Sequence, residues 1–231
     1  MNLYNYPIAP MLIALLIPLI YSYKWKRESL KQIWIVSLCC ILIVIVYPLV
    51  YFLQNIEVNL GYFLGKLIIF TIMPLIIILY LEEWKVKETL FKLGLRRQNL
   101  WKSIVLGIGA LMLTVTIALA IFWGQKVTIS TDWNVIMFFD AFNEEFLFRG
   151  VLLIYLWKIT DIKIAYSTSI LAFILAHSQY YTVTLMVELI STVAQGVLLA
   201  IIAHKTKNII GPWISHGLTR AIPQIVRAVL F

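Results

Sequence analysis

Residues 143–150 read Asn-Glu-Glu-Phe-Leu-Phe-Arg-Gly, which places two glutamates and an arginine within a stretch that is otherwise apolar enough for a lipid bilayer. An ionisable side chain at the centre of a bilayer costs about 2.5–3.5 kcal/mol even on the most permissive insertion scales. We therefore expect these charged residues to form a functional site.

The spacing of the charges predicts different roles for the two glutamates. Glu145 and Arg149 are four residues apart, so they share one helix face in the favourable orientation for an ion pair. Glu144 points about 100° away and lacks this partner. We interpret Glu145 and Arg149 as a structural pair and predict that Glu144 is a general base. Asp140, one turn before Glu144, could line the same face.

Two histidines lie in apolar segments that follow this motif. His177 comes one helical turn after Phe173, and His216 comes one turn before Arg220. A water molecule held between Glu144 and the two imidazoles could be deprotonated by the carboxylate, while the imidazoles orient it or stabilise an oxyanion. Peptide-bond hydrolysis needs this set of roles.

The composition predicts an all-α, polytopic membrane protein. Of the 231 residues, 62% are hydrophobic and 13% are charged, and the mean hydropathy is +0.92; a soluble domain carries about 25% charged residues. Lys and Arg outnumber Asp and Glu by 19 to 11. Most of these basic residues lie in short loops between apolar segments, so they predict membrane topology and argue against a nucleic acid partner.

Apolar windows of about 20 residues predict a bundle of about eight transmembrane helices in a single domain, residues 1–231. The windows are 7–23, 32–53, 58–81, 103–124, 134–157, 162–182, 183–203 and 209–230. Basic loops alternate with loops almost free of Lys and Arg, which predicts that the basic loops are cytoplasmic. The segment 82–101 mixes apolar and basic residues; it either lies on an anionic headgroup surface or is a plain loop.

Two further charged residues lie within predicted spans. Lys66 is in the third span and Glu188 is in the seventh. Each is either a partner in the polar cavity or a side chain that extends to the membrane interface.

These residues resemble the motifs of the CAAX-protease and bacteriocin-processing (CPBP, or Abi) family of intramembrane endopeptidases, which is related to the type II CAAX prenyl endopeptidase. The family motifs are EExxxR, FxxxH, and HxxxN or HxxxD. The matching residues are Glu144, Glu145 and Arg149 for the first motif, Phe173 and His177 for the second, and His216 for the start of the third. The resemblance covers about residues 140–220, within a family-like core of about 134–231.

The resemblance implies an eight-helix bundle with catalytic residues inside a membrane, which the family suggests is a bacterial plasma membrane. It implies cleavage of peptide bonds in hydrophobic or lipidated peptides, with membrane lipid as the other partner. Glu144 would activate water with His177, and His216 would help to stabilise the oxyanion. The implied mechanism uses no metal and no cofactor; zinc bound by these three residues is the alternative.

One residue departs from the family pattern, because Arg220 stands where the third motif has Asn or Asp. Its guanidinium could donate hydrogen bonds to an oxyanion, or it could clamp Glu144 or Asp140 and weaken Glu144 as a base. The alternative function is therefore a catalytically impaired family member that acts in bacteriocin immunity, as a scaffold or as a regulator. A proton-coupled carrier is a third hypothesis, but the sequence has no inverted repeats.

Overall fold

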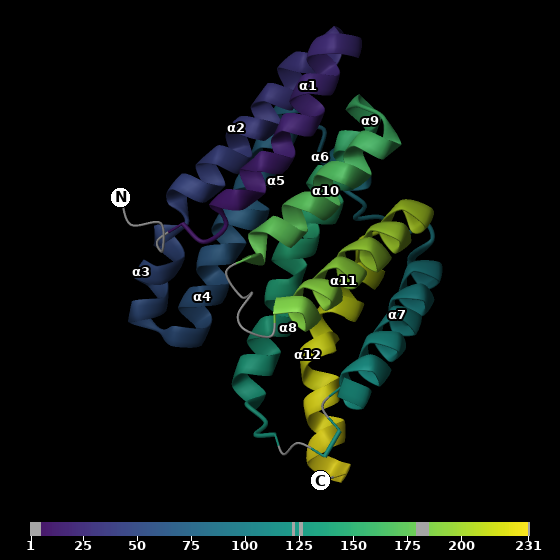
Figure 1. Ribbon diagram of the computed structural model, residues 1–231. Helices are drawn as coiled ribbons and strands as arrows, with labels where there is room; N and C mark the ends of the chain where they lie inside the picture. Colours follow the sequence, from purple (N-terminus) through teal and green to yellow (C-terminus); the bar gives the residue numbers. More distant parts are fainter. Residues whose placement is uncertain (1–5, 122, 125–126, 179–184, 231) are drawn as a thin grey trace.

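The computed structural model describes residues 6–121, 123–124, 127–178 and 185–230, with the backbone alone at 185–188. All regular structure within these residues is helical, which confirms the predicted all-α class. In Figure 1 the helices pack side by side, and α8 runs between the N-terminal helices and the C-terminal ones.

The N-terminal half is a series of helices joined by short turns. These are a 3-10 segment (Ala9–Leu15) continuing into α1 (Leu16–Trp25), then α2 (Leu30–Val46), α3 (Pro48–Ile56), α4 (Val58–Lys66), a π-helical stretch (Leu67–Ile72) and α5 (Met73–Leu81). The prediction of one span over 32–53 is wrong, because Pro48 begins a new helix. Proline fits the first turn of a helix but not its interior. As a result, α3 folds against α4 as a short hairpin (Figure 1).

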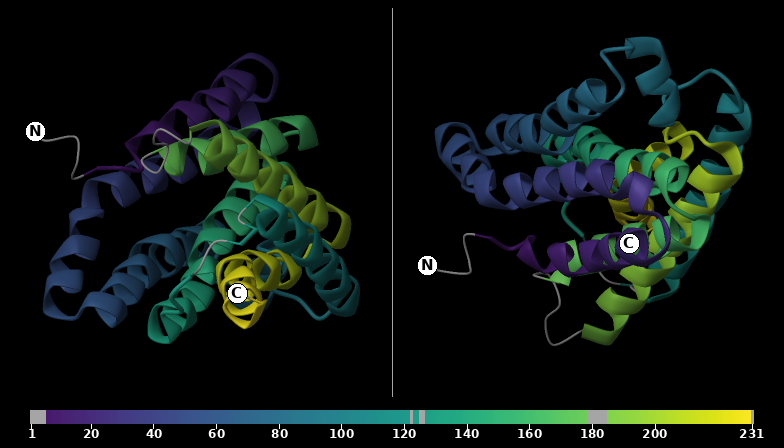
Figure 2. Two further views of the ribbon diagram at one scale, coloured as in Figure 1. Left: turned by 60° about the horizontal axis from the view of Figure 1, so that its bottom comes forward. Right: turned by 90° about the horizontal axis from the view of Figure 1, so that it is seen from above.

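The C-terminal half contains the sequence motifs. Its helices are α6 (Val86–Lys92), α7 (Leu100–Ile121), α8 (Thr131–Glu145), a π-helical stretch (Phe146–Tyr155), α9 (Leu156–Ile159), α10 (Ile162–Ala176), α11 (Leu185–Thr206) and α12 (Ile210–Leu230). α8, the π-helical stretch and α9 follow one another without a break and cover the predicted span 134–157. Figure 2 shows α12, in yellow, beside the teal helices α7 and α8, with which it makes extensive contacts.

The outer surface of the bundle is apolar, as expected for an integral membrane protein. Large apolar side chains are more than half exposed on two of the helices: Leu38 and Ile45 of α2, and Val105 and Met112 of α7. Soluble proteins rarely expose large apolar patches in this way. Four helical segments are long and apolar enough to cross a membrane: 27–46, 58–81, 100–121 and 189–206. Two shorter apolar helices cover 9–25 and 162–176. The predicted total of about eight spans stays a prediction.

Two glycines allow α7 and α12 to approach each other closely. A Cβ atom at Gly107 would lie 2.3 Å from the Gly211 carbonyl oxygen, and one at Gly211 would lie 1.9 Å from the Ser103 carbonyl oxygen. The Ser103 hydroxyl accepts a hydrogen bond from the Gly211 N–H at 3.0 Å. Small residues at such crossings are typical of helix packing in membranes. This crossing holds α12, which carries His216, against α7.

We predict that Gly107→Ala lowers the stability of the protein in detergent by about 1–3 kcal/mol, the usual cost of overpacking a tight contact. Heating followed by size-exclusion chromatography measures the loss of folded protein. Gly109→Ala is the matched control, since a Cβ atom at Gly109, in the same helix, meets nothing within 4 Å. Equal melting temperatures for the two variants would contradict the inferred close contact.

Candidate active site

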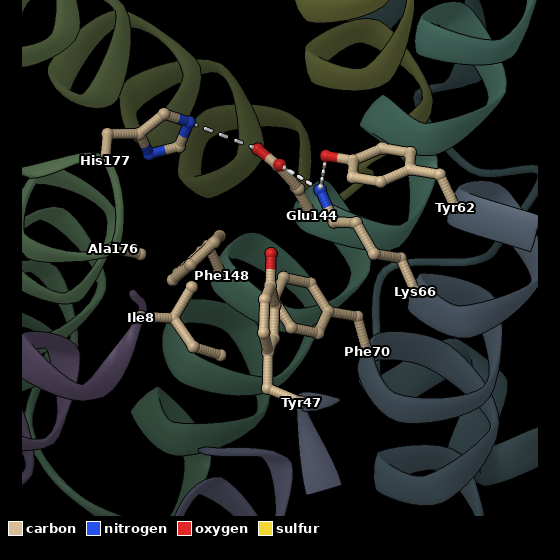
Figure 3. Close-up of a pocket in the computed structure, with 9 residues that line it drawn as sticks. All are labelled: Ile8, Tyr47, Tyr62, Lys66, Phe70, Glu144, Phe148, Ala176 and His177. Atoms are coloured by element: carbon tan, nitrogen blue, oxygen red, sulfur yellow. Dashed lines mark hydrogen bonds and ion pairs between the residues drawn. The ribbon is translucent and has the colours of Figure 1, made fainter. Parts of the chain in front are cut away.

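The three residues predicted to act in catalysis come together from three helices. Glu144 is in the last turn of α8, His177 follows the end of α10, and His216 is in α12. Each contributes a ligand atom, and these atoms all lie within 4.8 Å of one another. Glu144 Oε2 lies 3.4 Å from His177 Nε2 and 3.8 Å from His216 Nε2. Figure 3 shows the His177 imidazole and the Glu144 carboxylate facing each other.

The contact made by Nδ1 fixes the orientation of each imidazole ring. His177 Nδ1 lies 2.8 Å from the Phe173 carbonyl oxygen, and His216 Nδ1 lies 2.8 Å from Glu145 Oε1. A carbonyl and a carboxylate can only accept, so both Nδ1 atoms carry a proton and donate it. Each ring therefore presents Nε2 to Glu144, where it can accept a proton or, when protonated, donate one.

The Phe173 ring contacts a residue of the first motif and both histidines. Arg149 is fully buried, and its guanidinium lies 3.1 Å from Glu145 Oε1 and 4.2 Å from the centre of the Phe173 ring. The same ring lies 4.3 Å from the His177 ring and 5.7 Å from the His216 ring. A buried cation over an aromatic face is stabilised by the ring quadrupole. Phe173 thus packs between Arg149 and both imidazoles.

Lys66 pairs with Glu144; the sequence placed Lys66 either in the polar cavity or at the membrane interface, without naming its partner. Its ammonium lies 2.5 Å from Glu144 Oε1, and it donates to the Tyr62 hydroxyl at 3.2 Å (Figure 3). The same ammonium lies 2.6 Å from Asp140 Oδ2. Lys66 is only 3% exposed. Glu144 is therefore paired with Lys66, while Arg149 pairs with Glu145. Of the two possibilities for Lys66, the buried one is correct.

A close helix contact places Lys66 at this depth. A Cβ atom at Gly65 would lie 2.7 Å from Val50 Cα, and one at Gly61 would lie 2.0 Å from the Leu53 carbonyl oxygen. These two glycines, four residues apart, let α4 pack directly against α3. The Gly-x-x-x-Gly spacing just before Lys66 was the sequence signal that could have indicated a packed helix face there.

An open cavity reaches the three residues. It has a volume of about 430 Å³, and a neighbouring cavity of about 270 Å³ shares part of its wall. Residues that line both are Met137, Glu144, His177, His216 and Arg220. The Glu144 carboxylate and both imidazoles therefore line the same cavities.

Arg220 lies on the wall of both cavities. Its side chain is exposed, and its guanidinium lies 6.0 Å from the centre of the Trp133 ring. Among the side chains that the structure describes, no ion pair joins Arg220 to Glu144 or Asp140. The Glu188 side chain, the other sequence candidate, lies outside the described residues.

The buried charges of the site do not sum to zero. The described cations are Lys66 and Arg149, and the carboxylates are Asp140, Glu144 and Glu145, so the formal sum is 2 − 3 = −1. A proton on one imidazole would balance this sum. Zn²⁺ could also use Glu144 Oε2 and the two Nε2 atoms as ligands, since imidazoles fixed through Nδ1 are common in zinc sites.

Comparison with known proteins identifies the family of this segment. Residues 126–222 match the family model for type II CAAX prenyl endopeptidase Rce1-like proteins. The matched segment covers less than half of the chain but contains all the motif residues from Glu144 to His216. Searches of curated proteins and of solved structures found no match. The chain thus carries an Rce1-like domain, which confirms the resemblance inferred from the motifs.

We predict that Lys66→Met destabilises the protein by about 3–5 kcal/mol, because two carboxylates would stay buried without their cation. The melting temperature in detergent measures this loss. Adding Asp140→Asn to Lys66→Met should recover part of it, since one of the two orphaned charges is then removed. The control is Lys85→Met, which breaks an exposed pair with Glu83 and should leave the melting temperature unchanged. Wild-type stability of Lys66→Met would show that the buried cluster is not needed.

Proposed function

We propose, because residues 126–222 belong to the Rce1-like family, that this protein is an intramembrane endopeptidase that cleaves hydrophobic or lipidated peptides. The family supports a CAAX-type intramembrane protease. The observation that carries the proposal is the convergence of Glu144, His177 and His216, from three helices, on one point beside a cavity of about 430 Å³.

In the proposed mechanism Glu144 acts as the general base. Its Oε2 atom is buried without a hydrogen-bond partner among the described residues, and it faces both imidazoles. Oε2 takes a proton from a water molecule, and the water oxygen attacks the carbonyl carbon of the peptide. When the C–N bond breaks, Glu144 returns the proton to the leaving nitrogen. The products are a carboxylic acid and an amine.

The two histidines act on the water and on the oxyanion. His177 Nε2 is the nearer to Glu144 and can orient the attacking water. His216, protonated at Nε2, donates to the oxyanion that forms on the carbonyl oxygen. Glu145 accepts from Nδ1 of the same ring and so offsets its positive charge. Arg149 holds Glu145 in place from the other side.

Lys66 fixes the geometry of the base. It binds Oε1 of Glu144, which leaves Oε2 to face the histidines. Since Asp140 shares the same ammonium, Glu144 competes for only part of its charge. The carboxylate is therefore oriented while one of its oxygens stays able to accept a proton.

The charge balance of the site supports the metal-free form of this mechanism. Among the buried side chains, one proton on an imidazole neutralises the formal sum of −1, whereas Zn²⁺ would leave an excess of +1. The Lys66 ammonium on Glu144 also opposes the binding of a second cation to the same carboxylate.

We predict that Glu144→Gln lowers peptide cleavage by at least about 100-fold while the protein stays folded, because the amide cannot accept the proton. The measurement is a cleavage assay in liposomes with a library of hydrophobic and lipidated peptides. Glu83→Gln removes an exposed carboxylate and serves as the control.

The same assay with the Arg220→Asn variant distinguishes an active protease from the catalytically impaired alternative. Cleavage by wild type that is lost in Glu144→Gln supports the protease. Full activity of Glu144→Gln would contradict Glu144 as the base. A silent wild type with activity in Arg220→Asn would instead support the catalytically impaired alternative.

We also predict that cleavage persists after dialysis against a metal chelator such as EDTA, with less than about a twofold change. The rate before and after dialysis, with metal content measured in parallel, is the readout. Loss of cleavage on dialysis and its recovery on addition of Zn²⁺ would refute the metal-free mechanism and favour zinc at Glu144, His177 and His216.

A further inference from the structure

A second group of charged residues lies at the far end of the helix that carries Glu144. Lys158 is in α9, 158 − 144 = 14 residues further along the continuous helix, which corresponds to roughly 20 Å. A hollow of about 110 Å³ opens beside it. The residues that line it are Phe91, Arg96, Ile154, Trp157, Lys158 and Lys207.

Three cations surround this hollow, and the six lining residues include no carboxylate. The Arg96 guanidinium lies 4.7 Å from the centre of the Phe91 ring, and the Lys158 ammonium lies 5.5 Å from the same ring. The Lys207 ammonium lies 4.5 Å from the Trp157 ring. The aromatic rings thus hold the cations around one space. Two acids lie nearby: Glu82 is paired with Lys92, and Glu88 lines an adjoining hollow together with Lys158.

The cations come from separate parts of the chain that hydrogen bonds tie together. The Asn208 side chain donates to the Arg96 carbonyl oxygen at 2.6 Å, and Arg96 itself donates to the Thr206 carbonyl oxygen at 3.2 Å. Arg96 Nε is buried and has no acceptor among the described residues. The loop before α7 and the turn after α11 therefore form a fixed wall of the hollow, with one donor left unused.

Lys158 lies among other cations, and its pKa reflects them. Lys158 lies one residue beyond the predicted span 134–157. Burial, together with the charges of Lys92 and Arg96, lowers the pKa of Lys158 to about 8. Like charges gathered in one place repel one another, and a bound anion would relieve this repulsion.

We propose that Arg96, Lys158 and Lys207 form a binding site for a phosphate group. Room for one water requires roughly 10–15 Å³ of such space, so 110 Å³ accommodates a group of several atoms. Arginine and lysine are the usual partners of phosphate oxygens. The hollow lies at the basic-loop end of the bundle, where lipid headgroups meet a membrane protein. The phosphate is supplied either by an anionic phospholipid or by a soluble phosphate.

The test measures binding to the full chain in nanodiscs of phosphatidylcholine. One arm adds phosphatidylglycerol and the other adds inorganic phosphate; native mass spectrometry counts bound lipid, and the melting temperature reports both. The variant is Lys158→Gln with Lys207→Gln. Its control, Lys102→Gln with Lys205→Gln, removes the same charge from exposed positions that do not line the hollow.

We expect binding to become about tenfold weaker or more in the variant and to stay near wild type in the control. Retention of phosphatidylglycerol alone identifies a lipid as the source, and a shift with inorganic phosphate identifies a soluble phosphate. Equal losses in variant and control would overturn the site, since binding would then follow net charge. No binding in either arm would overturn it as well. Cleavage activity is not used as a readout, so this result is independent of the proposed protease function.

Discussion

Each charge buried inside the apolar bundle must be paired with an opposite charge or a hydrogen-bonding group. The rest of the structure depends on this constraint. Lys66 bridges α4 to α8 through Asp140 and Glu144. Glu145 bridges the same helix to α12 through His216 while it holds Arg149 within its own helix. Removing one partner from such a pair leaves an uncompensated charge, which costs far more than an ordinary contact. The network that fixes the helix packing is therefore also the network that orients the proposed catalytic groups.

These two roles make opposite demands on Glu144. Packing favours a carboxylate that is held tightly by Lys66, whereas a general base needs an oxygen that can accept a proton. The two oxygens of the Glu144 carboxylate meet these two demands separately. Oε1 is held by Lys66, and Oε2 faces His177 and His216 at 3.4 and 3.8 Å. Both imidazoles therefore lie farther from Oε2 than the Lys66 ammonium lies from Oε1.

The sequence predicted those features that depend on residues close together in the chain. Hydropathy placed the helical segments 58–81 and 134–157, and motif spacing placed Glu145 and Arg149 one turn apart. It did not reach the pairing of Lys66 with Glu144, because these residues are 78 positions apart and a lysine near a membrane can also extend to the interface. The break at Pro48 was missed for a different reason, since an apolar window does not register a change of helix direction.

The two ends of the long helix containing α8 and α9 balance charge in different ways. Among the buried side chains that the structure describes around Glu144, the carboxylates exceed the cations by one. Around Lys158 the cations are in excess, and no lining residue compensates them. At bilayer depth an unbalanced charge is costly, so the chain itself supplies partners for the charges around Glu144. At the interface, headgroups and dissolved anions are present. Cations without a carboxylate partner in the chain can therefore be neutralised there by an external phosphate group.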